Sequence, residues 1–586
     1  MRLTRRLLAV VAFVALIVVL IRYRRNVQYT IEEAIEEVSA EWKAAEEEAK
    51  AKNRELPQVI LPFGKSDDEK KAAIEQAVEE KAHGVDSPAA AAAESNTDAD
   101  KGDAKTAVPP KEESKGDNDM QKQAVGDAKE IEAFWEKWSQ AIYESRPKVP
   151  KITLGGKAQA HKPKDGQVTR EPYRNHLRNS EEDIDILRLL HRKFVGGLEK
   201  EFLNTTVDGE DQDRKWEGLP IFKGKGVVMV GGGEYFGPAI ISIHMLRRTG
   251  CNLPVEVFVP DESEYEEVVC KNYLKKLGAR CVVLSDILDK SKIKVGRKDD
   301  ADLKISHYQL KSLALLLSSY SDVLLLDSDS IPVLDPLLNI LETEPYKSKG
   351  MIIWPDFWRS TESPEYWKIA GKEFPTFLPA TSSEAGQLAV NKATHLAPLL
   401  LATYYNIFGP DYYYPLLSQG ALGEGDKETF LAAAVALNAT YYRIKTPAAS
   451  LGRHDGATQK GTAMVQHLPS DDLKHESTSR ESIRPMFLHS NTPKMNAGHL
   501  VDEGDLVSVD GETRLRLLGS KDELVKRFGF DVEQSIWDIM LQTGCELQDI
   551  IEEWKGRKRM CERLAEHYKK VFGLPSGASV PNPKGT

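Results

Sequence analysis

Two aspartates separated by one small residue, Asp327 and Asp329, have the clearest capacity for chemistry in this chain. They follow Val323–Leu326, a short apolar run that is typical of a strand buried on both faces. Side chains alternate along a strand, so both carboxylates point the same way if the strand continues through them. Neighbouring carboxylates repel each other unless a cation lies between them, and Mg²⁺ or Mn²⁺ prefers oxygen ligands. The spacing predicts a metal site at a strand end, with a solvated turn as the alternative.

Two downstream segments carry polar side chains that could complete such a site. Ile352–Trp358 is a dense aromatic cluster that holds one carboxylate, Asp356. Aromatic faces bind sugar rings well, although a cluster in the core is the alternative interpretation. Further along, Gln387 and Asn391 could hydrogen-bond hydroxyl groups.

Two more segments combine charge with a change of local structure. Asp426 and Glu428 lie in a glycine-flexed loop that opens an expected helix, Glu428–Leu437. Acidic residues there either interact favourably with the helix dipole or bind a sugar hydroxyl. His489 and Lys494 follow an expected strand end, where a histidine can be a ligand or a structural residue.

The elements around these residues predict an α/β fold with a mainly parallel sheet, because strands alternate with helices from about residue 180 onward. A glycine-rich turn at Gly232 follows the first strand and either brings backbone close to a phosphate or sugar, or forms a simple tight turn. The expected strands are Val227–Val230, Val255–Val259 and Cys281–Leu284, and the expected helices are Pro238–Arg248, Glu264–Leu277 and Tyr308–Ser319.

The beginning of the chain predicts a membrane anchor. Leu7–Ile21 is a run of 15 apolar residues bracketed by arginines, with no cleavage pattern after it, so we expect an uncleaved signal anchor. Two glycosylation sequons, at Asn204 and Asn438, predict that the rest of the chain is lumenal. The net charge of −11 and the lack of a nucleic-acid-binding signature argue against nucleic acid.

The composition divides the chain into a tail (1–6), the anchor (7–21), a lumenal stem (22–180), a catalytic domain (181–575) and a C-terminal tail (576–586). The stem has helical and disordered segments. Heptad spacing at residues 31–42 suggests a helix through which the stem could self-associate. A second amphipathic helix, marked by Phe134, Trp135, Trp138 and Ile142, is expected to dock on the globular part. Five cysteines allow one or two disulfides, with Cys545–Cys561 a possible pair.

Five motifs taken together resemble the fungal Golgi α-mannosyltransferases of glycosyltransferase family 71. The likeness covers about residues 220–500. Within that family the sequence is most similar to the α-1,2-mannosyltransferases that start or extend branches on the outer chain of N-glycans. The motifs are Leu324–Pro336, Trp354–Trp358, Ala385–Lys392, Gly425–Phe430 and Phe487–Asn491.

The resemblance implies a GT-A type fold with a Rossmann-like sheet, GDP-mannose as donor, and Mn²⁺ or another divalent cation as cofactor. It implies a mannosylated glycan as acceptor and a place in the Golgi membrane. By motif, Asp329 would bind the metal, Asp327 would contact the metal or the donor ribose, and His489 could complete the metal shell. Lys311, one helix earlier, could add positive charge beside the diphosphate.

These assignments define the predicted site. The donor and its metal are assigned to Asp327, Asp329, His489, Lys311, Gly232 and Lys494, and catalysis or acceptor binding to Asp426, Glu428, Asp356 and Gln387. An α-linked product from an α-linked donor implies retention of configuration. The sequence leaves open whether an enzyme carboxylate or the acceptor itself attacks, and whether the linkage is α-1,2 or α-1,3.

Two rival interpretations come from other classes of protein. In an Asp-x-Asp phosphatase Asp327 would be the nucleophile. That motif normally closes the first strand of its domain, whereas about 100 residues of α/β sequence precede it here, and its distal motif needs an aspartate where Phe430 stands. An inactive transferase-like scaffold would have lost a metal carboxylate, and both aspartates are present.

Overall fold

The structure is a computed structural model that describes residues 126–164, 167–208, 211–296, 303–455, 458–474, 483–502 and 504–573. All of these residues belong to one compact unit that spans 107–586. The expected anchor, the heptad helix at 31–42, most of the stem and the C-terminal tail lie outside the described residues. None of the helices in the described part is both long and apolar enough to cross a membrane.

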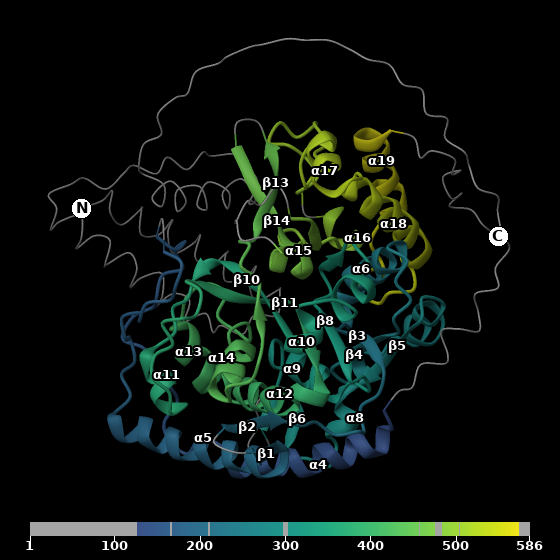
Figure 1. The fold of residues 1–586 in the computed structure, drawn as a ribbon. Coiled ribbons are helices and arrows are strands. Elements are labelled where there is room, and N and C mark those ends of the chain that lie inside the picture. Colours follow the sequence, from purple (N-terminus) through teal and green to yellow (C-terminus); the bar gives the residue numbers. More distant parts are fainter. Residues whose placement is uncertain are drawn as a thin grey trace, which may run out of the picture. The chain divides into compact units, whose positions relative to one another are not determined.

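A seven-stranded mixed sheet forms the centre of the unit (Figure 1), with strand order β12-β10-β11-β8-β3-β4-β5. β11 is antiparallel to its neighbours β8 and β10, and the other neighbouring pairs are parallel. The expected parallel-rich α/β sheet is therefore confirmed. The strands are β3 (Lys225–Val230), β4 (Val255–Val259), β5 (Ala279–Val283), β8 (Asp322–Leu326), β10 (Met351–Arg359), β11 (Thr381–Asn391) and β12 (Tyr442–Arg443).

Both faces of this sheet are buried, which explains the continuous apolar sequence of β8. Val323 and Leu325 point into one hydrophobic core, whereas Leu324 and Leu326 point into the other. All four side chains are at most 1% exposed. Because successive residues of a strand face opposite sides, an apolar run without alternation fits only a strand covered on both sides.

Helices and a second sheet cover the two faces (Figure 1). The first core contains residues of α4 (Ala128–Glu144), α5 (Glu181–Phe202), α9 (Gln309–Leu317), α12 (Lys392–Ile407) and α14 (Thr429–Ala436). The second core contains residues of α6 (Phe236–Arg248), α18 (Val532–Leu547) and α19 (Met560–Phe572). The expected helices at 238–248 and 308–319 correspond to α6 and α9. The one expected at 264–277 is a π-helical turn, Val268–Tyr273, followed by α7 (Leu274–Lys276).

A four-stranded antiparallel sheet, in the order β13-β14-β15-β9, packs beside the large one. Its strands are β9 (Ser330–Pro332), β13 (Ala449–Asp455), β14 (Thr458–His467) and β15 (Pro485–His489). β9 begins directly after Asp329, and its Ser330 pairs with His489 of β15. The chain thus passes from the large sheet to the small one within the Asp-Ser-Asp motif, so the predicted site lies where the two sheets meet.

Shorter elements complete the described fold. They are β1 (Leu203–Asp208), β2 (Asp211–Trp216), β6 (Ile293–Val295), β7 (Leu303–Ile305), α8 (Leu284–Leu288), α10 (Tyr346–Lys349), α11 (Pro364–Ile369), α13 (Tyr414–Ser418), α15 (Pro469–Lys474), α16 (Ala497–Leu500) and α17 (Lys521–Phe528). Disulfides join Cys545 to Cys561, as the sequence suggested, and Cys270 to Cys281.

The segment before α5, expected to belong to the stem, packs into the same core as the sheet. Trp135 and Trp138 on α4 are 1% and 3% exposed, and the Trp138 ring stacks on Phe202 with centroids 5.1 Å apart. An extended stretch follows, in which the backbone N–H of Arg170 donates to the carbonyl of Leu378 at 2.7 Å. The compact unit therefore begins well before residue 181, because the aromatic face of α4 needs a partner to cover it.

We expect Trp135→Ala to lower the free energy of unfolding by about 3–5 kcal/mol, the usual cost of emptying a buried tryptophan site. Urea denaturation of the folded chain measures this. Glu136→Ala, on the exposed side of the same helix, is the control and should change stability by no more than about 0.5 kcal/mol. Equal effects of the two variants would mean that α4 is not part of the folded core.

Candidate active site

The two aspartates are brought together by a turn, which corrects the expectation that a continuing strand aligns them. β8 ends at Leu326, and the backbone N–H of Ser330 donates to the carbonyl of Asp327 at 2.9 Å, closing a four-residue turn. The side chain of Asp329 is 2% exposed and that of Asp327 is 23% exposed. The chain turns here because it must leave the large sheet to enter the small one.

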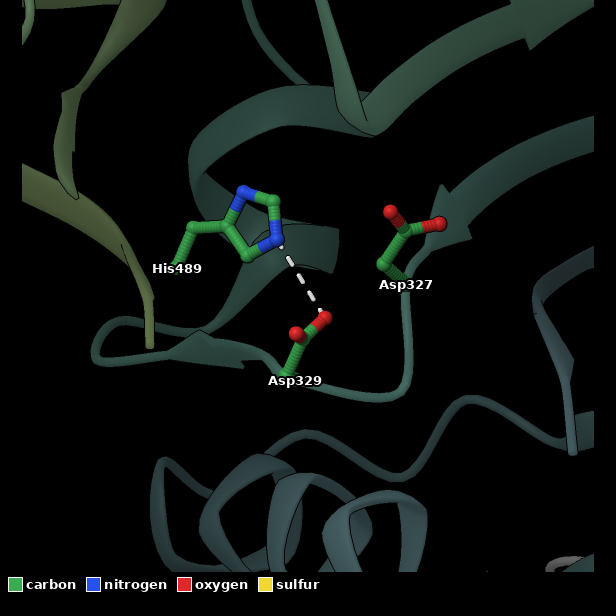
Figure 2. Close-up of side chains that lie close together, drawn as sticks. All are labelled: Asp327, Asp329 and His489. Carbon is green, nitrogen blue, oxygen red and sulfur yellow. Dashed lines mark ion pairs between the residues drawn. The ribbon is translucent and has the colours of Figure 1, made fainter. Parts of the chain in front are cut away.

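Asp327, Asp329 and His489 converge on one point, as Figure 2 shows. One ligand atom from each lies within 4.8 Å of the others, and Nε2 of His489 is 3.2 Å from Oδ1 of Asp329. Two carboxylates and one imidazole fit a divalent cation such as Mn²⁺, which accepts mainly oxygen ligands. The three residues predicted to bind a metal are therefore the ones that the tertiary structure brings together.

Two lysines stand beside these carboxylates. Nζ of Lys311 is 3.1 Å from Oδ2 of Asp327 and 3.1 Å from Oδ2 of Asp426, so it bridges the two. Lys494 forms an ion pair with Oδ2 of Asp329. Both lysines were predicted from the sequence, and the structure places each charge against at least one carboxylate of the site.

Burial and charge act on these acids in opposite directions. Burial raises the pKa of Asp327, and neighbouring Asp329 adds to the rise while Lys311 opposes it. Although burial alone would raise the pKa of Asp329, His489 and Lys494 hold it below its ordinary value. The pKa of His489 lies well above its ordinary value because Glu384 and Asp329 outweigh its burial. Coordination of a metal through Nε2 requires that nitrogen to lose its proton.

Glu384 is a site residue that the sequence analysis did not select. Its Oε2 is 3.3 Å from Nδ1 of His489, and its Oε1 accepts the backbone N–H of Ala385 at 3.0 Å and of Gly386 at 2.9 Å. Burial would raise its pKa, but His489 and then Lys311 lower it to about 2. In the sequence it directly precedes the Ala385–Lys392 motif. Its orientation, however, depends on a shift in the pairing of β11 with β10, which occurs between Ile353 and Trp354.

Gln387 supports the site from inside the sheet. Its side chain is fully buried, its Nε2 donates to Oε2 of Glu384 at 3.0 Å, and its Oε1 accepts from Oγ of Ser330 at 3.2 Å. Asn391, also expected to bind hydroxyls, accepts the backbone N–H of Ala393 at 2.8 Å and caps α12. Neither amide faces the open part of the site.

The three acids assigned to catalysis or the acceptor lie in different ion pairs. Asp426 shares Lys311 with Asp327, and burial raises its pKa to about 6 despite Lys311. Asp356 accepts from Nζ of Lys427 at 2.7 Å. Among the three, only Asp426 is thus linked to a predicted metal ligand, Asp327, and the link runs through Lys311. The chain order could not show this, because Lys311 and Asp426 are far apart in sequence.

Glu428 lies in a buried charge cluster of its own. It accepts the backbone N–H of Ser383 at 2.6 Å and pairs with Arg170 at 3.5 Å, while Arg170 also pairs with Glu362 at 2.8 Å. These three side chains are at most 3% exposed. Burial raises the pKa of Glu362 to about 7, and Glu428 adds to the rise while Arg170 opposes it. Arg170 comes from the segment expected to be stem, so no sequence signal linked it to the site.

A small pocket borders this charge cluster. Its walls include Ser382, Leu422, Lys427 and Glu428, together with Trp358 from the end of β10. The aromatic cluster of β10 is thus divided: Trp358 lines the pocket, whereas the other tryptophan of the motif is a core residue that packs against β15. Glu428 is the one carboxylate and Trp358 the one aromatic ring among its lining residues, and the enclosed space of about 10 Å³ has room for about one water molecule.

The glycine-rich turn is followed by an aromatic residue, Tyr235, that lies against Lys494 of the site. Gly232 has a φ of +100°, and a Cβ there would come within 2.4 Å of Oε2 of Glu264, so only glycine fits. The turn leads to Tyr235, which is 38% exposed, and Nζ of Lys494 lies 5.7 Å from the centre of its ring. Tyr308, 55% exposed, has the same relation to Lys311 at 6.0 Å. Two exposed aromatic rings therefore flank the two lysines.

Comparison with known proteins agrees with this arrangement. A family model described as "Mannosyltransferase putative" matches residues 224–379 and 372–479. Alpha-1,2-mannosyltransferase MNN21 of Candida albicans is 31% identical over 513 residues, which are 74% of this chain and 74% of that protein. Alpha-1,2-mannosyltransferase MNN5 of Saccharomyces cerevisiae (strain YJM789) is 32% identical, over 65% of this chain and 77% of that protein.

Other similarities cover less of the chain. Alpha-1,2-mannosyltransferase MNN2 of Saccharomyces cerevisiae is 38% identical over 45% of this chain and 48% of its own length. Galactosyltransferase LgtC, solved in complex with donor and acceptor sugar analogs, covers 37% of this chain with 12% identity and a TM-score of 0.23, a likeness too weak to bear on the fold. By its similarity to MNN21 over 74% of both chains, this chain belongs to the family of fungal α-1,2-mannosyltransferases, and it is a glycosyltransferase.

The buried carboxyl of Glu362 should make stability depend on pH. The pKa of this carboxyl is about 7 in the folded chain, against 4.5 for a glutamate in the unfolded chain. The folded state therefore holds the proton to higher pH. The free energy of unfolding should therefore fall as pH rises from about 4.5 to 7, by up to about 3 kcal/mol from this group. Glu362→Gln removes the titration and should flatten this slope.

Urea denaturation at a series of pH values measures the effect. Glu373→Gln, an exposed glutamate, is the control and should keep the slope of the wild-type chain. If Glu362→Gln also keeps that slope, the carboxyl does not carry its proton into the folded state.

Proposed function

We propose that this glycosyltransferase has a GT-A type catalytic domain that transfers mannose from GDP-mannose to mannose on N-glycan outer chains or other mannans. The reaction depends on a divalent cation, with Mn²⁺ the expected one, retains the configuration and makes an α-1,2 linkage, with α-1,3 as the alternative. The main observation that supports this proposal is that Asp327, Asp329 and His489 converge beside two lysines. The names of the relatives support the linkage and the sugar.

The donor half of the proposed site contains the charges suited to a nucleoside diphosphate. Asp327, Asp329 and His489 would hold the cation, which when bound supplies positive charge to the diphosphate as it leaves. Lys494 is free to exchange its contact with Asp329 for a phosphate oxygen, because its side chain is 38% exposed. The ring of Tyr235, three residues after Gly232, borders the same lysine and offers a surface for the nucleotide.

The acceptor half would lie on the surface around the small pocket beside Trp358 and Glu428, because the pocket itself has room for only about one water molecule. A mannose ring can stack on the indole while its hydroxyls bond to carboxylates. Oδ2 of Asp356 is bound by Lys427 and Oδ1 accepts the backbone N–H of Phe357 at 2.6 Å, so an acceptor hydroxyl would share one of these oxygens. Asp426 lies between the two halves, because Lys311 ties it to Asp327. We therefore assign Asp426 to the transferred sugar rather than to the acceptor alone.

The phosphatase alternative is less well supported by this geometry. Asp327 would be its nucleophile, yet this carboxylate is bound by Lys311 and faces a second carboxylate and an imidazole. The same assay separates the two reactions: GDP-mannose consumed with a mannoside acceptor supports a transferase, and phosphate released from p-nitrophenyl phosphate supports the rival.

We also propose a single-pass type II topology in the Golgi membrane, with an anchor at 7–21, a stem that could self-associate, and a lumenal catalytic domain. The sequon asparagines Asn204 and Asn438 are both exposed, as glycosylation requires. Two disulfides within the described residues fit an oxidising compartment. This proposal keeps the tail, anchor, stem and catalytic domain predicted from the sequence, but the catalytic unit also includes α4.

Asp329→Ala should abolish mannosyl transfer and Mn²⁺-dependent binding of GDP-mannose while the chain stays folded. Its removal takes away one of the carboxylates expected to hold the cation, and EDTA should inactivate the wild-type enzyme reversibly for the same reason. Radiolabelled transfer and calorimetry measure the two effects. Asp522→Ala, on the exposed side of α17, should behave as wild type. Near-normal turnover in Asp329→Ala would overturn the proposed function.

Glycosylation tests the topology. In fungal secretory membranes the chain should lose apparent mass on endoglycosidase treatment, and Asn204→Gln and Asn438→Gln should each remove one glycan. Protease added to sealed vesicles should leave the catalytic unit intact until detergent is present. Digestion without detergent would reverse the orientation.

A further inference from the structure

Hydrogen bonds and ion pairs form a closed ring in the site, which begins at Asp329 and returns to the next residue in the chain, Ser330. Oδ1 of Asp329 is 3.2 Å from Nε2 of His489, whose Nδ1 is 3.3 Å from Oε2 of Glu384. The same Oε2 accepts from Nε2 of Gln387 at 3.0 Å, and Oε1 of that amide accepts from Ser330 at 3.2 Å. Ser330 follows Asp329 in the chain, so the ring is complete.

We propose that Glu384 is a positioning residue that fixes the tautomer and orientation of His489. With Nδ1 donating to Glu384, Nε2 is the nitrogen left to give up its proton to a cation, and it faces Asp329 and the metal position (Figure 2). Histidines that bind metals commonly donate their other ring N–H to a carboxylate in this way. This inference rests on the metal site of the proposed function and adds a residue to it.

The surroundings of Glu384 suit it to hold a neighbour rather than to bind a cation itself. Its Oε1 accepts two backbone N–H groups, from Ala385 and Gly386, and its Oε2 is shared by Gln387 and His489. Four donors thus keep the carboxylate ionised and immobile. Its side chain is 13% exposed, so these bonds are little weakened by water.

Gly386, two residues after Glu384, has no room for a side chain. A Cβ on Gly386 would come within 2.6 Å of Nδ1 of His489 and 2.9 Å of Oε2 of Glu384. The register of β11 shifts at this point, since Ile353 pairs with Leu388 whereas Trp354 pairs with Glu384. A bulge of this kind redirects a side chain, and here it brings the carboxylate to the histidine.

The test is the affinity of the full chain for Mn²⁺ alone, measured by electron paramagnetic resonance of the free ion. We expect Glu384→Gln to weaken Mn²⁺ binding about 10–100-fold. The amide would place an N–H opposite Nδ1 of His489, which favours the tautomer whose proton sits on Nε2. Glu533→Gln, a fully buried glutamate of α18 that accepts two backbone N–H groups, is the matched control and should leave the affinity within about twofold.

A double-mutant cycle separates positioning from direct ligation or a general loss of charge. If Glu384 acts through the imidazole, Glu384→Gln should have little further effect on Mn²⁺ affinity in a His489→Ala chain. An equal loss in both backgrounds would overturn the proposal, as would unchanged affinity in the single variant. Melting temperatures without metal show whether each variant folds, and Gly386→Ala, which displaces the imidazole, should weaken binding as a second perturbation.

The outcomes also distinguish this inference from the proposed function. A wild-type chain that binds no Mn²⁺ would refute the metal site itself. A wild-type chain that binds Mn²⁺, with Glu384→Gln binding it equally well, would refute only the role given to Glu384.

Discussion

Repulsion between carboxylates is the constraint on which the rest of the site depends. Asp327, Asp329, Glu384 and Asp426 lie close together with little exposure to water, where like charges interact strongly. The fold partly offsets this by placing a cationic or protonatable side chain between two of the pairs: Lys311 between Asp327 and Asp426, and His489 between Asp329 and Glu384. A divalent cation would add the charge that these contacts only partly supply, which is a physical reason for the site to bind one.

The junction of two sheets makes this concentration of charge possible. β8 delivers the aspartates from the large sheet, and β15 delivers His489 from the small one, with the turn after Leu326 connecting them. The second charge cluster, around Arg170 and Glu428, lies beside a pocket rather than at the metal position. The proposed function assigns the first part of the site to a nucleoside diphosphate and the second to a sugar acceptor.

Local patterns were enough to predict several elements of the large sheet and its helices, and long-range pairing accounts for the errors. β4 has the predicted bounds, and α6 and α9 differ from theirs by a few residues, because apolar periodicity is a property of neighbouring residues. The strand expected to continue through Asp329 ends early, because the next three residues pair with β15, more than 150 residues away. Arg170 was assigned to the stem, since nothing near it in sequence signals a buried ion pair with Glu428.

The sequence alone was enough to select the residues that could bind a metal and to place them at strand ends in an α/β fold. Their types and spacing are local, and a motif such as Asp-Ser-Asp can be identified without knowledge of where it lies in the fold. Only the tertiary structure decided which charges meet: that Lys311 joins Asp327 to Asp426, and that Glu384 reaches His489. These contacts depend on strand order, register and a bulge, and such features are fixed by packing between segments far apart in the chain.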